Sequence, residues 1–277
     1  MAQRPAVLVT GASSGIGLAT ATLLSEAGFD VLAGVRRPSG EDRKFREIPL
    51  DVTREESILR ARDEIAAHLG GAGLAALVNN AGVAEIGPLE YQSVDRFRGV
   101  FEVNVFGALA VTQAFLPLLR QARGRIVNIG SIGGMITIPF GSALCASKHA
   151  IESLSDALRM ELQPAGISVT CLQPASINSG SAEKLAGQLE RVIDELPPHG
   201  RTEYEDRLRS FMKATLASET TGSPPQVVAA VVLDVLRSSR PPSRQLVGKH
   251  AHVLKFLARG LPDRWRDRLL SRIFFGK

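Results

Sequence analysis

The stretch Val7-Leu8-Val9-Thr10-Gly11-Ala12-Ser13-Ser14-Gly15-Ile16-Gly17 decides the fold of this chain. A short apolar run with strand character is followed by glycines spaced G-x-x-x-G-x-G and then by a helical pattern. Small residues let the backbone turn tightly out of a strand and approach a pyrophosphate closely. The amino end of the next helix offers that anion unpaired N–H groups and a positive dipole. A glycine-rich turn can also be purely structural, but its place directly after the first strand predicts a nucleotide site built from Gly11, Ser13, Ser14, Gly15, Ile16 and Gly17.

Outward from this stretch, short β-rich apolar runs alternate with longer helical patterns. Strands are predicted over residues 6–9, 31–34, 75–78, 125–129, 167–172 and 245–247. Helices are predicted over residues 15–27, 54–69, 94–120, 142–163 and 225–237. This alternation predicts a doubly wound α/β fold with a parallel sheet, whose ligand crevice lies at the carboxyl ends of the strands.

We expect a single domain over residues 1–277. Residues 178–223 are more polar and contain Pro197-Pro198-His199-Gly200, which favours a substrate lid over a second domain. Residues 250–277 read as one basic, amphipathic C-terminal helix with a solvated face. A membrane-surface or partner-docking helix is the alternative that this pattern leaves open. Its basic residues are Arg259, Arg264, Arg266, Arg268, Arg272 and Lys277.

Composition narrows the class of protein. The chain has 277 residues, 44% of them hydrophobic, and a formal net charge of +5. Apolar runs fall short of the roughly 18–20 residues that cross a bilayer, and the N-terminus leaves no room for a signal peptide. The two cysteines, Cys145 and Cys171, have neither disulfide-scaffold nor metal-site spacing. The basic residues near the C-terminus sit among leucines and not in an aromatic-rich patch, which argues against nucleic acid. We therefore expect a cytoplasmic protein without a metal site.

The end of the second predicted strand indicates which nucleotide is preferred. It reads Val31-Leu32-Ala33-Gly34-Val35-Arg36-Arg37. A carboxylate here would bind the adenosine ribose and favour NAD(H), but Asp30 stands at the opposite end of the strand. Two arginines suit a doubly charged 2′-phosphate, so NADP(H) is favoured over NAD(H).

Three more polar residues are spaced in a recognisable way. Ser131 stands 13 positions before Leu144, Lys148 stands four positions after it, and Asn104 precedes them in Val103-Asn104-Val105-Phe106-Gly107. Together with the glycine-rich turn and Asn79-Asn80-Ala81-Gly82, this order resembles the short-chain dehydrogenase/reductase family. The segments around 101–120 and 145–152 resemble its retinol- and steroid-dehydrogenase-like branch.

The resemblance implies a Rossmann fold with a mostly seven-stranded parallel sheet. It also implies a homodimer or homotetramer formed through the long helices. In the family, the asparagine kinks a helix and holds a water, the serine binds a substrate carbonyl, and the lysine grips the nicotinamide ribose; these roles fall on Asn104, Ser131 and Lys148. Further cofactor contacts are implied for Asp51, Val52, Asn80, Ala81, Gly82, Pro174 and Ile177. Ala175 stands where the family has a glycine.

Leu144 is the departure from this pattern, because the family has its catalytic tyrosine there. Leucine can neither donate nor accept the proton, and losing such an acid typically costs about 10²–10⁴-fold in rate. Tyr204 or His199 from the lid, or a water held by Ser131 and Lys148, could replace it. Cys145 and His149 are rotated by about 100° on the helix and are expected to face away.

An apolar pocket is expected beside this position, with substrate contacts from Met135, Ile136, Phe140, Leu144 and Tyr204. Three functions follow. The first is an NADP(H)-dependent oxidoreductase that acts on a hydrophobic alcohol or ketone with an altered proton source. The second is a non-redox cyclase, isomerase or lyase on the same fold. The third is a catalytically silent nucleotide-binding subunit.

Overall fold

Seven parallel strands form one sheet in the computed structural model, which describes residues 4–276. Met1, Ala2, Gln3 and Lys277 lie outside the described residues. The strand order is β3-β2-β1-β4-β5-β6-β7, with the change of winding direction between β1 and β4. The strands are β1 (Ala6–Thr10), β2 (Asp30–Val35), β3 (Arg46–Pro49), β4 (Ala76–Asn79), β5 (Arg125–Ile129), β6 (Ser168–Pro174) and β7 (Arg244–Val247).

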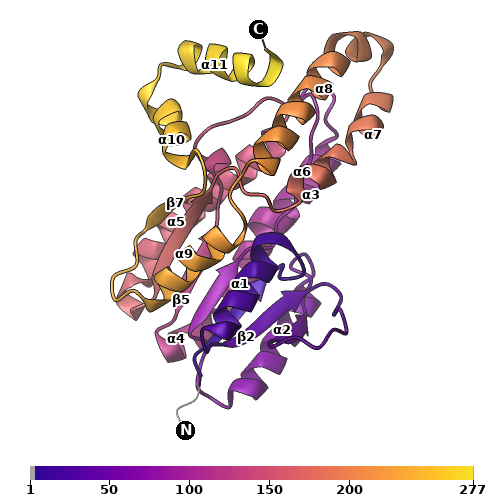
Figure 1. Ribbon diagram of the computed structural model, residues 1–277. Helices are drawn as coiled ribbons and strands as arrows, with labels where there is room; N and C mark the ends of the chain where they lie inside the picture. The colour runs from indigo at the N-terminus through magenta and orange to yellow at the C-terminus, as the bar shows by residue number, and fades with distance from the viewer. Residues whose placement is uncertain (1–3, 277) are drawn as a thin grey trace.

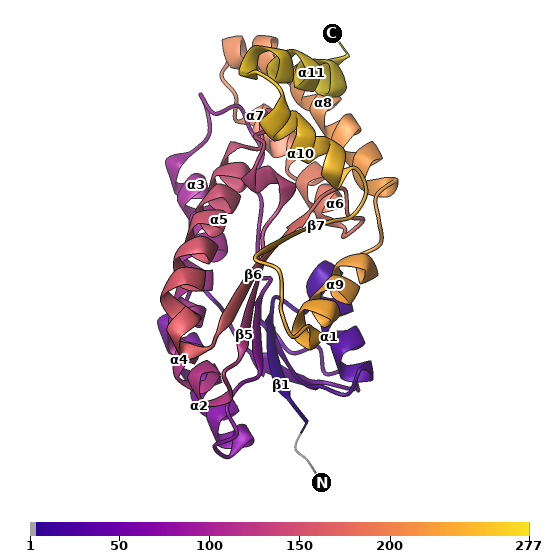
Figure 2. The same ribbon diagram turned by 90° about the vertical axis from the view of Figure 1, so that its left-hand side faces the viewer.

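Helices cover both faces of this sheet, as the alternating pattern predicts (Figures 1 and 2). One face carries α1 (Gly15–Glu26) and α9 (Gln226–Arg237). The other face carries α2 (Glu55–Leu69), α4 (Ala108–Ala122) and α5 (Ser142–Leu162). The doubly wound Rossmann architecture expected from the sequence is thus confirmed, and all seven strands are parallel.

Strand β3 is the element that the sequence pattern did not predict. It has four residues, Arg46-Glu47-Ile48-Pro49, and lies at the edge of the sheet. Only Ile48 is buried, because its side chain is the one in this short edge strand that points into the hydrophobic core. So short a segment with two charged residues carries too little periodicity to be read as a strand.

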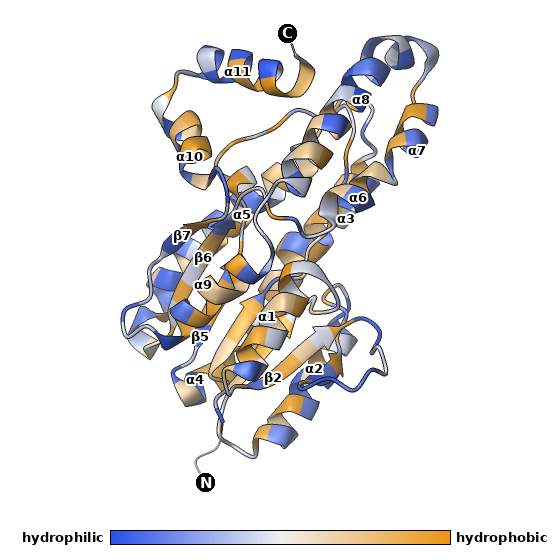
Figure 3. Cartoon of the chain, in the orientation of Figure 1, coloured by the Kyte–Doolittle hydropathy of each residue, from blue (hydrophilic) through white to orange (hydrophobic). Residues whose placement is uncertain are grey.

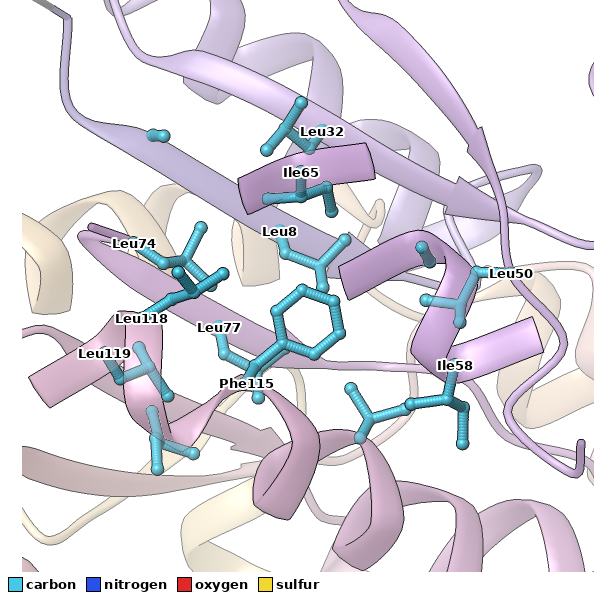
Figure 4. Packing of buried hydrophobic residues seen from close by; sticks show 14 of the residues in the cluster. Leu8, Leu32, Leu50, Ile58, Ile65, Leu74, Leu77, Phe115, Leu118 and Leu119 are labelled. Carbon is cyan, nitrogen blue, oxygen red and sulfur yellow. The ribbon is translucent and has the colours of Figure 1, made fainter. Parts of the chain in front are cut away.

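The larger hydrophobic core lies between the sheet and α2 and α4. Phe115 of α4 is fully buried and lies among Leu8, Leu77 and Ile58 in the close view (Figure 4). The strands are coloured mostly hydrophobic along their length in Figure 3, as expected for a parallel sheet that is covered on both faces.

The predicted helix 94–120 is interrupted where Asn104 stands. It consists of α3 (Val94–Phe101), a π-helical turn (Glu102–Gly107) and α4. A π-turn inside a helix often marks a functional position. By length and composition, the continuous segment Val94–Ala122 could cross a membrane. A helix that covers a sheet passes the same test, and Val111 and Phe115 bury one side of this one against β-strands.

The expected lid folds into three helices above the carboxyl ends of the strands (Figure 1). They are α6 (Ser181–Ala186), α7 (Leu189–Asp194) and α8 (Pro198–Thr220). A third apolar cluster holds them together and includes Ile193, Leu208 and Phe211. Phe140, whose φ is +57°, packs its ring edge-on against Phe211 and so ties the lid to the loop before α5.

The C-terminal segment forms two helices, α10 (Ala251–Gly260) and α11 (Asp263–Phe275), and not the single helix expected over 250–277. The break falls at Leu261-Pro262, where Leu261 is extended with φ −110° and ψ 140°. Proline disfavours helical backbone in the residue before it and has no N–H for a helical hydrogen bond. The chain therefore turns, and α11 packs beside α8.

Candidate active site

A cleft of about 770 Å³ opens at the carboxyl ends of β1, β2, β4, β5 and β6. This is where the strand order predicts a ligand crevice. Fourteen of the sixteen residues expected to contact a cofactor line this cleft. They are Gly11, Ser13, Ser14, Gly15, Ile16, Arg36, Asp51, Val52, Asn80, Ala81, Gly82, Lys148, Pro174 and Ile177.

The turn from β1 into α1 leaves space for a ligand because glycines stand at two positions where its backbone lines the cleft. Gly11 and Gly15 have φ of +65° and +55°, a region that favours glycine. Gly17 does not line the cleft, which corrects the expectation for this residue. It packs beneath the turn instead: a Cβ there would lie 2.3 Å from the Gly11 carbonyl oxygen and 2.4 Å from Asn80 Nδ2.

Asn80 fastens this turn to the end of β4. Its Nδ2 donates to the carbonyl oxygens of Thr10 and Gly11 at 3.0 and 3.1 Å. The Thr10 hydroxyl accepts from the backbone N–H groups of Asn80 and Ala81, both at 3.0 Å. The two loops at the switch point therefore form one hydrogen-bonded floor for the cleft.

Of the two arginines after β2, only Arg36 lines the cleft. Arg37 is exposed and lies outside the lining, which corrects the paired-arginine expectation. Asp51 lies near Arg36, and hydrogen bonds from the Thr53 backbone and hydroxyl lower the pKa of its carboxyl. Asp30 is bonded to His68 at 2.7 Å at the other end of β2, so it does not stand beside Arg36.

Lys148 of α5 is buried with its ammonium at the edge of the cleft. Its Nζ donates to the carbonyl oxygen of Ile129 at 2.7 Å. Burial lowers the pKa of Lys148 to about 8, although Cys171 and Glu152 act in the opposite direction. A lysine with a pKa this close to neutral can exchange a proton under ordinary conditions, unlike a solvated one.

Asn104 is held by the loop after β4 and by α5. Its Oδ1 accepts from Val83 N at 2.8 Å, and its Nδ2 donates to Val83 O and to Ser147 Oγ, both at 2.9 Å. Ser147 in turn donates to the Leu144 carbonyl at 2.7 Å. Asn104 is 2% exposed and does not line the cleft. Its contacts connect the π-turn to α5, one residue away from Lys148.

A second, apolar cavity of about 480 Å³ adjoins the cofactor cleft. Ser131 and Leu144 line both spaces, so they form part of the wall between them. The Ser131 hydroxyl accepts from Gly133 N at 2.9 Å, which caps a short 3-10 helix (Ile132–Gly134). Ser131 can still donate its hydroxyl hydrogen to a group bound at this wall.

Several expected substrate contacts stand elsewhere. Ile136 and Leu144 line the apolar cavity, whereas Met135, Phe140 and Tyr204 are outside its lining. The Tyr204 hydroxyl donates to Glu90 at 3.0 Å, and its ring packs edge-on against Tyr91 and Phe140. His199 is paired with the Tyr91 hydroxyl at 2.8 Å. Neither lid residue is therefore placed to replace a tyrosine at position 144.

Cys145 corrects the helix-face argument. It was expected to point away, yet it is 1% exposed and contributes to the lining of the apolar cavity. The cavity wraps around the first turn of α5, so two adjacent residues reach it. Burial raises the pKa of the Cys145 thiol, which keeps it protonated and unreactive.

The short chain dehydrogenase family matches residues 5–190 of this chain. The chain belongs to that family. It is 35% identical to 3-ketodihydrosphingosine reductase of Bacteroides thetaiotaomicron, over 97% of each chain. It is 34% identical to retinol dehydrogenase 5 of Mus musculus, over 96% of this chain and 88% of the other. A short chain dehydrogenase of Burkholderia cenocepacia J2315, solved in complex with NADP, superposes with a TM-score of 0.70 at 25% identity, over 98% of both chains.

This short-chain dehydrogenase has cleft residues that sequence reasoning missed. Ser179, Ser181, Lys184 and Gln188 come from the lid and line the cleft. Lys184 Nζ donates to Ser14 Oγ at 3.3 Å, across 170 residues of sequence. No motif marks these positions; only the folding of the lid over the β1–α1 turn brings them there.

The residue in the family's glycine position is accommodated without strain. Ala175 is buried, and its N–H donates to the Val247 carbonyl at 2.9 Å. The positive φ of this loop, +45°, falls on Ser176 and not on Ala175. A Cβ at residue 175 therefore meets no conformational penalty.

Gly17→Ala should weaken nucleotide binding, because the added Cβ would displace either Gly11 or Asn80 from the floor of the cleft. We expect a loss of at least about tenfold in affinity, or about 1.4 kcal/mol, measured by titration of cofactor fluorescence. Gly99→Ala is the matched control, since a Cβ there meets nothing within 4 Å. Equal affinities for the two variants would contradict this account of the turn.

Proposed function

We propose that this short-chain dehydrogenase is an NADP(H)-dependent oxidoreductase that acts on a hydrophobic alcohol or ketone and takes its proton from a source other than residue 144. The observation that supports this proposal is the wall at Ser131 and Leu144, which lines both a cleft of mixed polar and apolar surface and an apolar cavity. Buried Lys148 lines the cleft on the same side. A reacting carbon at this wall would be within reach of both spaces.

The cleft suits a dinucleotide by its shape and its donors. The N-terminal turn of α1 follows Ser14, which makes no side-chain cap, so its backbone N–H groups remain available to a pyrophosphate. Gly11, Gly15 and Ser13 would hold the phosphates, and Asn80 and Lys148 the two riboses. A nicotinamide cofactor supplies hydride transfer when it is bound.

Preference for NADP(H) rests on Arg36. Arg36 lines the cleft where β2 ends, and its charge helps to lower the pKa of the Asp51 carboxyl. A planar guanidinium can bind a phosphate through two parallel hydrogen bonds. We therefore assign the 2′-phosphate to Arg36, since Arg37 is exposed and is not among the residues that line the cleft.

The proton source that we propose is Lys148, acting through a water held between it and the Ser131 hydroxyl. Lys148 is buried beside the cleft and its pKa of about 8 permits proton release near neutral pH. Ser131 has a hydroxyl hydrogen free to orient that water or a substrate oxygen. Leu144 makes the wall apolar and has no phenol hydroxyl that could donate the proton in place of this water.

The apolar cavity supports a hydrophobic substrate. Its lining residues include Ile136, Leu144, Leu254, Leu257 and Phe274. Among the described residues that line it, Glu85 and Glu219 are the only ones with a carboxylate. Glu219 accepts hydrogen bonds from Ser179, Ser181 and Ala182, so it belongs to the lid's own framework. We propose a cytoplasmic homo-oligomer as the working form, joined through α4 and α5.

A non-redox reaction on this fold is the second candidate. It is favoured by one observation: Leu144, which lines the cleft beside Ser131, cannot take part in proton exchange. An apolar wall would fold an apolar substrate for cyclisation, isomerisation or elimination. Turnover that continues without nicotinamide would favour this candidate, and strict consumption of NADPH would exclude it.

Arg36→Ala should lower NADP affinity by about 10–100-fold, which corresponds to the roughly 1.5–3 kcal/mol of a charge-assisted hydrogen bond. NAD affinity should hardly change, because NAD lacks the 2′-phosphate. Arg37→Ala is the matched control and should leave both affinities unchanged. Isothermal titration with each dinucleotide measures this, and an equal loss in the two variants would refute the role of Arg36.

Leu144→Tyr should raise the rate of ketone reduction by about 10²–10⁴-fold, since it places a phenol beside Lys148. Leu144→Phe supplies the ring without the hydroxyl and should not raise the rate. The measurement is NADPH oxidation against a panel of hydrophobic ketones. Equal rates in the Tyr and Phe variants would show that a missing acid does not limit this site.

The rate of ketone reduction should fall as pH rises above about 8, because Lys148 loses its proton there. The sign follows from burial, which lowers the pKa of an ammonium, so the proton-donating form exists only below that value. In Lys148→Arg the charge persists at every accessible pH, and the alkaline fall should disappear even if the rate is low. An identical alkaline fall in this variant would assign it to another group.

A further inference from the structure

Four large apolar side chains stand out from α10 and α11. Val253 and Phe256 of α10 are 58% and 62% exposed, and Trp265 and Ile273 of α11 are 64% and 51% exposed. Exposed apolar residues scattered singly need no explanation, but a group on two adjoining helices does. In Figure 3, hydrophobic and hydrophilic residues alternate along α11. We call these four residues the apical patch.

The apical patch adjoins the apolar cavity. Val253 and Ile273 are more than half exposed, yet both also line the cavity. Leu254, Leu257 and Phe274, on the inner sides of the same helices, line its interior. Helices α10 and α11, which carry the patch, therefore also form part of the cavity wall. They lie at the end of the molecule above the carboxyl ends of the strands (Figure 2).

Cationic side chains accompany the patch. Lys255, Arg259, Arg264, Arg268 and Arg272 are all exposed. Within residues 4–276 none of these five makes an ion pair with a carboxylate. Arg266 alone among the basic residues of α11 is paired, with Asp263 and Asp267. The Arg268 guanidinium lies 5.8 Å from the centre of the Trp265 ring, so charge and aromatic surface are presented together.

We propose that the apical patch docks on an anionic phospholipid surface, so that the side of the apolar cavity formed by Val253 and Ile273 faces the boundary between headgroups and acyl chains. Helices that lie in a membrane surface combine Lys and Arg with Trp, Phe and Leu and insert their apolar side by about 5–10 Å. Tryptophan favours the interface because its ring is apolar and its N–H is polar. Unpaired guanidinium groups bind lipid phosphates directly.

Charge favours a lipid surface over a second copy of the chain as the occupant. A twofold interface would bring the same patch together from both copies, and with it the unpaired Arg264, Arg268 and Arg272. Like charges facing one another oppose association, and the core of a protein interface is usually depleted in charged residues. An anionic bilayer supplies the opposite charge to every arginine.

Docking would also give the substrate a path. A hydrophobic alcohol or ketone dissolves in the acyl region and would enter the cavity between Val253 and Ile273 without passing through water. The substrate path rests on the proposed function, whereas docking on a lipid surface does not. The two are tested separately below.

Co-sedimentation with vesicles tests docking on the full chain without cofactor or substrate. We expect binding to vesicles of phosphatidylcholine and phosphatidylglycerol in equal parts, and much weaker binding to phosphatidylcholine alone. Raising the salt concentration from about 0.1 M to about 1 M should weaken binding, because the Debye length falls from about 10 Å to about 3 Å. No binding to the anionic vesicles at low salt would overturn the proposal.

Two variants separate the apolar and the cationic contributions. Phe256→Ser with Trp265→Ser should reduce the partition coefficient by at least about tenfold. Arg264→Gln with Arg268→Gln and Arg272→Gln should reduce it by about a hundredfold, at roughly 1 kcal/mol for each cationic side chain near the surface. Leu89→Ser with Val227→Ser is the matched control, since these side chains are 65% and 37% exposed outside the patch and outside α4 and α5, and it should leave the partition coefficient unchanged.

NADP binding by all variants shows that they remain folded. Light scattering in parallel identifies the competing occupant: if Phe256→Ser with Trp265→Ser dissociates an oligomer while the unaltered chain fails to bind vesicles, the patch is an interface between copies and the proposal is wrong. An equal loss of vesicle binding in the Leu89/Val227 control would also refute it. Vesicle binding by a chain that oxidises no NADPH would support docking while contradicting the proposed reaction.

Discussion

The rest of the site depends on one constraint, which is the close packing of the chain where β1 turns into α1. Gly17 has no room for a Cβ because the Gly11 carbonyl and the Asn80 amide occupy that space. Asn80 bonds to both carbonyls of the turn and thereby joins the ends of β1 and β4. This contact fixes the floor of the cleft at the switch point of the sheet, and helix α1 starts from it with its N–H groups directed at the ligand.

The active-site wall combines an intact framework with an altered reactive position. Asn104, Ser147 and the Leu144 carbonyl form a chain of hydrogen bonds that places the first turns of α5 against the loop after β4. Lys148 is buried by that placement, and burial brings its pKa to about 8. Leucine at position 144 has no ionisable group, so Lys148 is the residue to which we assign proton transfer in the proposed function.

Most of the sheet and its covering helices could be predicted from the sequence, because buried parallel strands and amphipathic helices have distinct periodicities. Strand β3 could not, since four residues at a sheet edge carry almost no pattern. The C-terminal segment kept its helical periodicity across Pro262, so one helix was expected where two form. The resulting turn between α10 and α11 places Leu254 and Phe274 in the lining of the apolar cavity, a position that no local sequence feature indicates.

The sequence by itself determined the family, the fold, the glycine-rich turn and the absence of a phenol at position 144, because each of these depends on residue type and spacing along the chain. Tertiary structure alone decided which side chains face the ligand spaces. It placed Arg36 but not Arg37 in the lining of the cleft, and it brought Lys184 to Ser14 across 170 residues. It also turned Tyr204 away toward Glu90. The physical reason is that the direction of a side chain depends on how whole helices pack, which residue spacing does not encode.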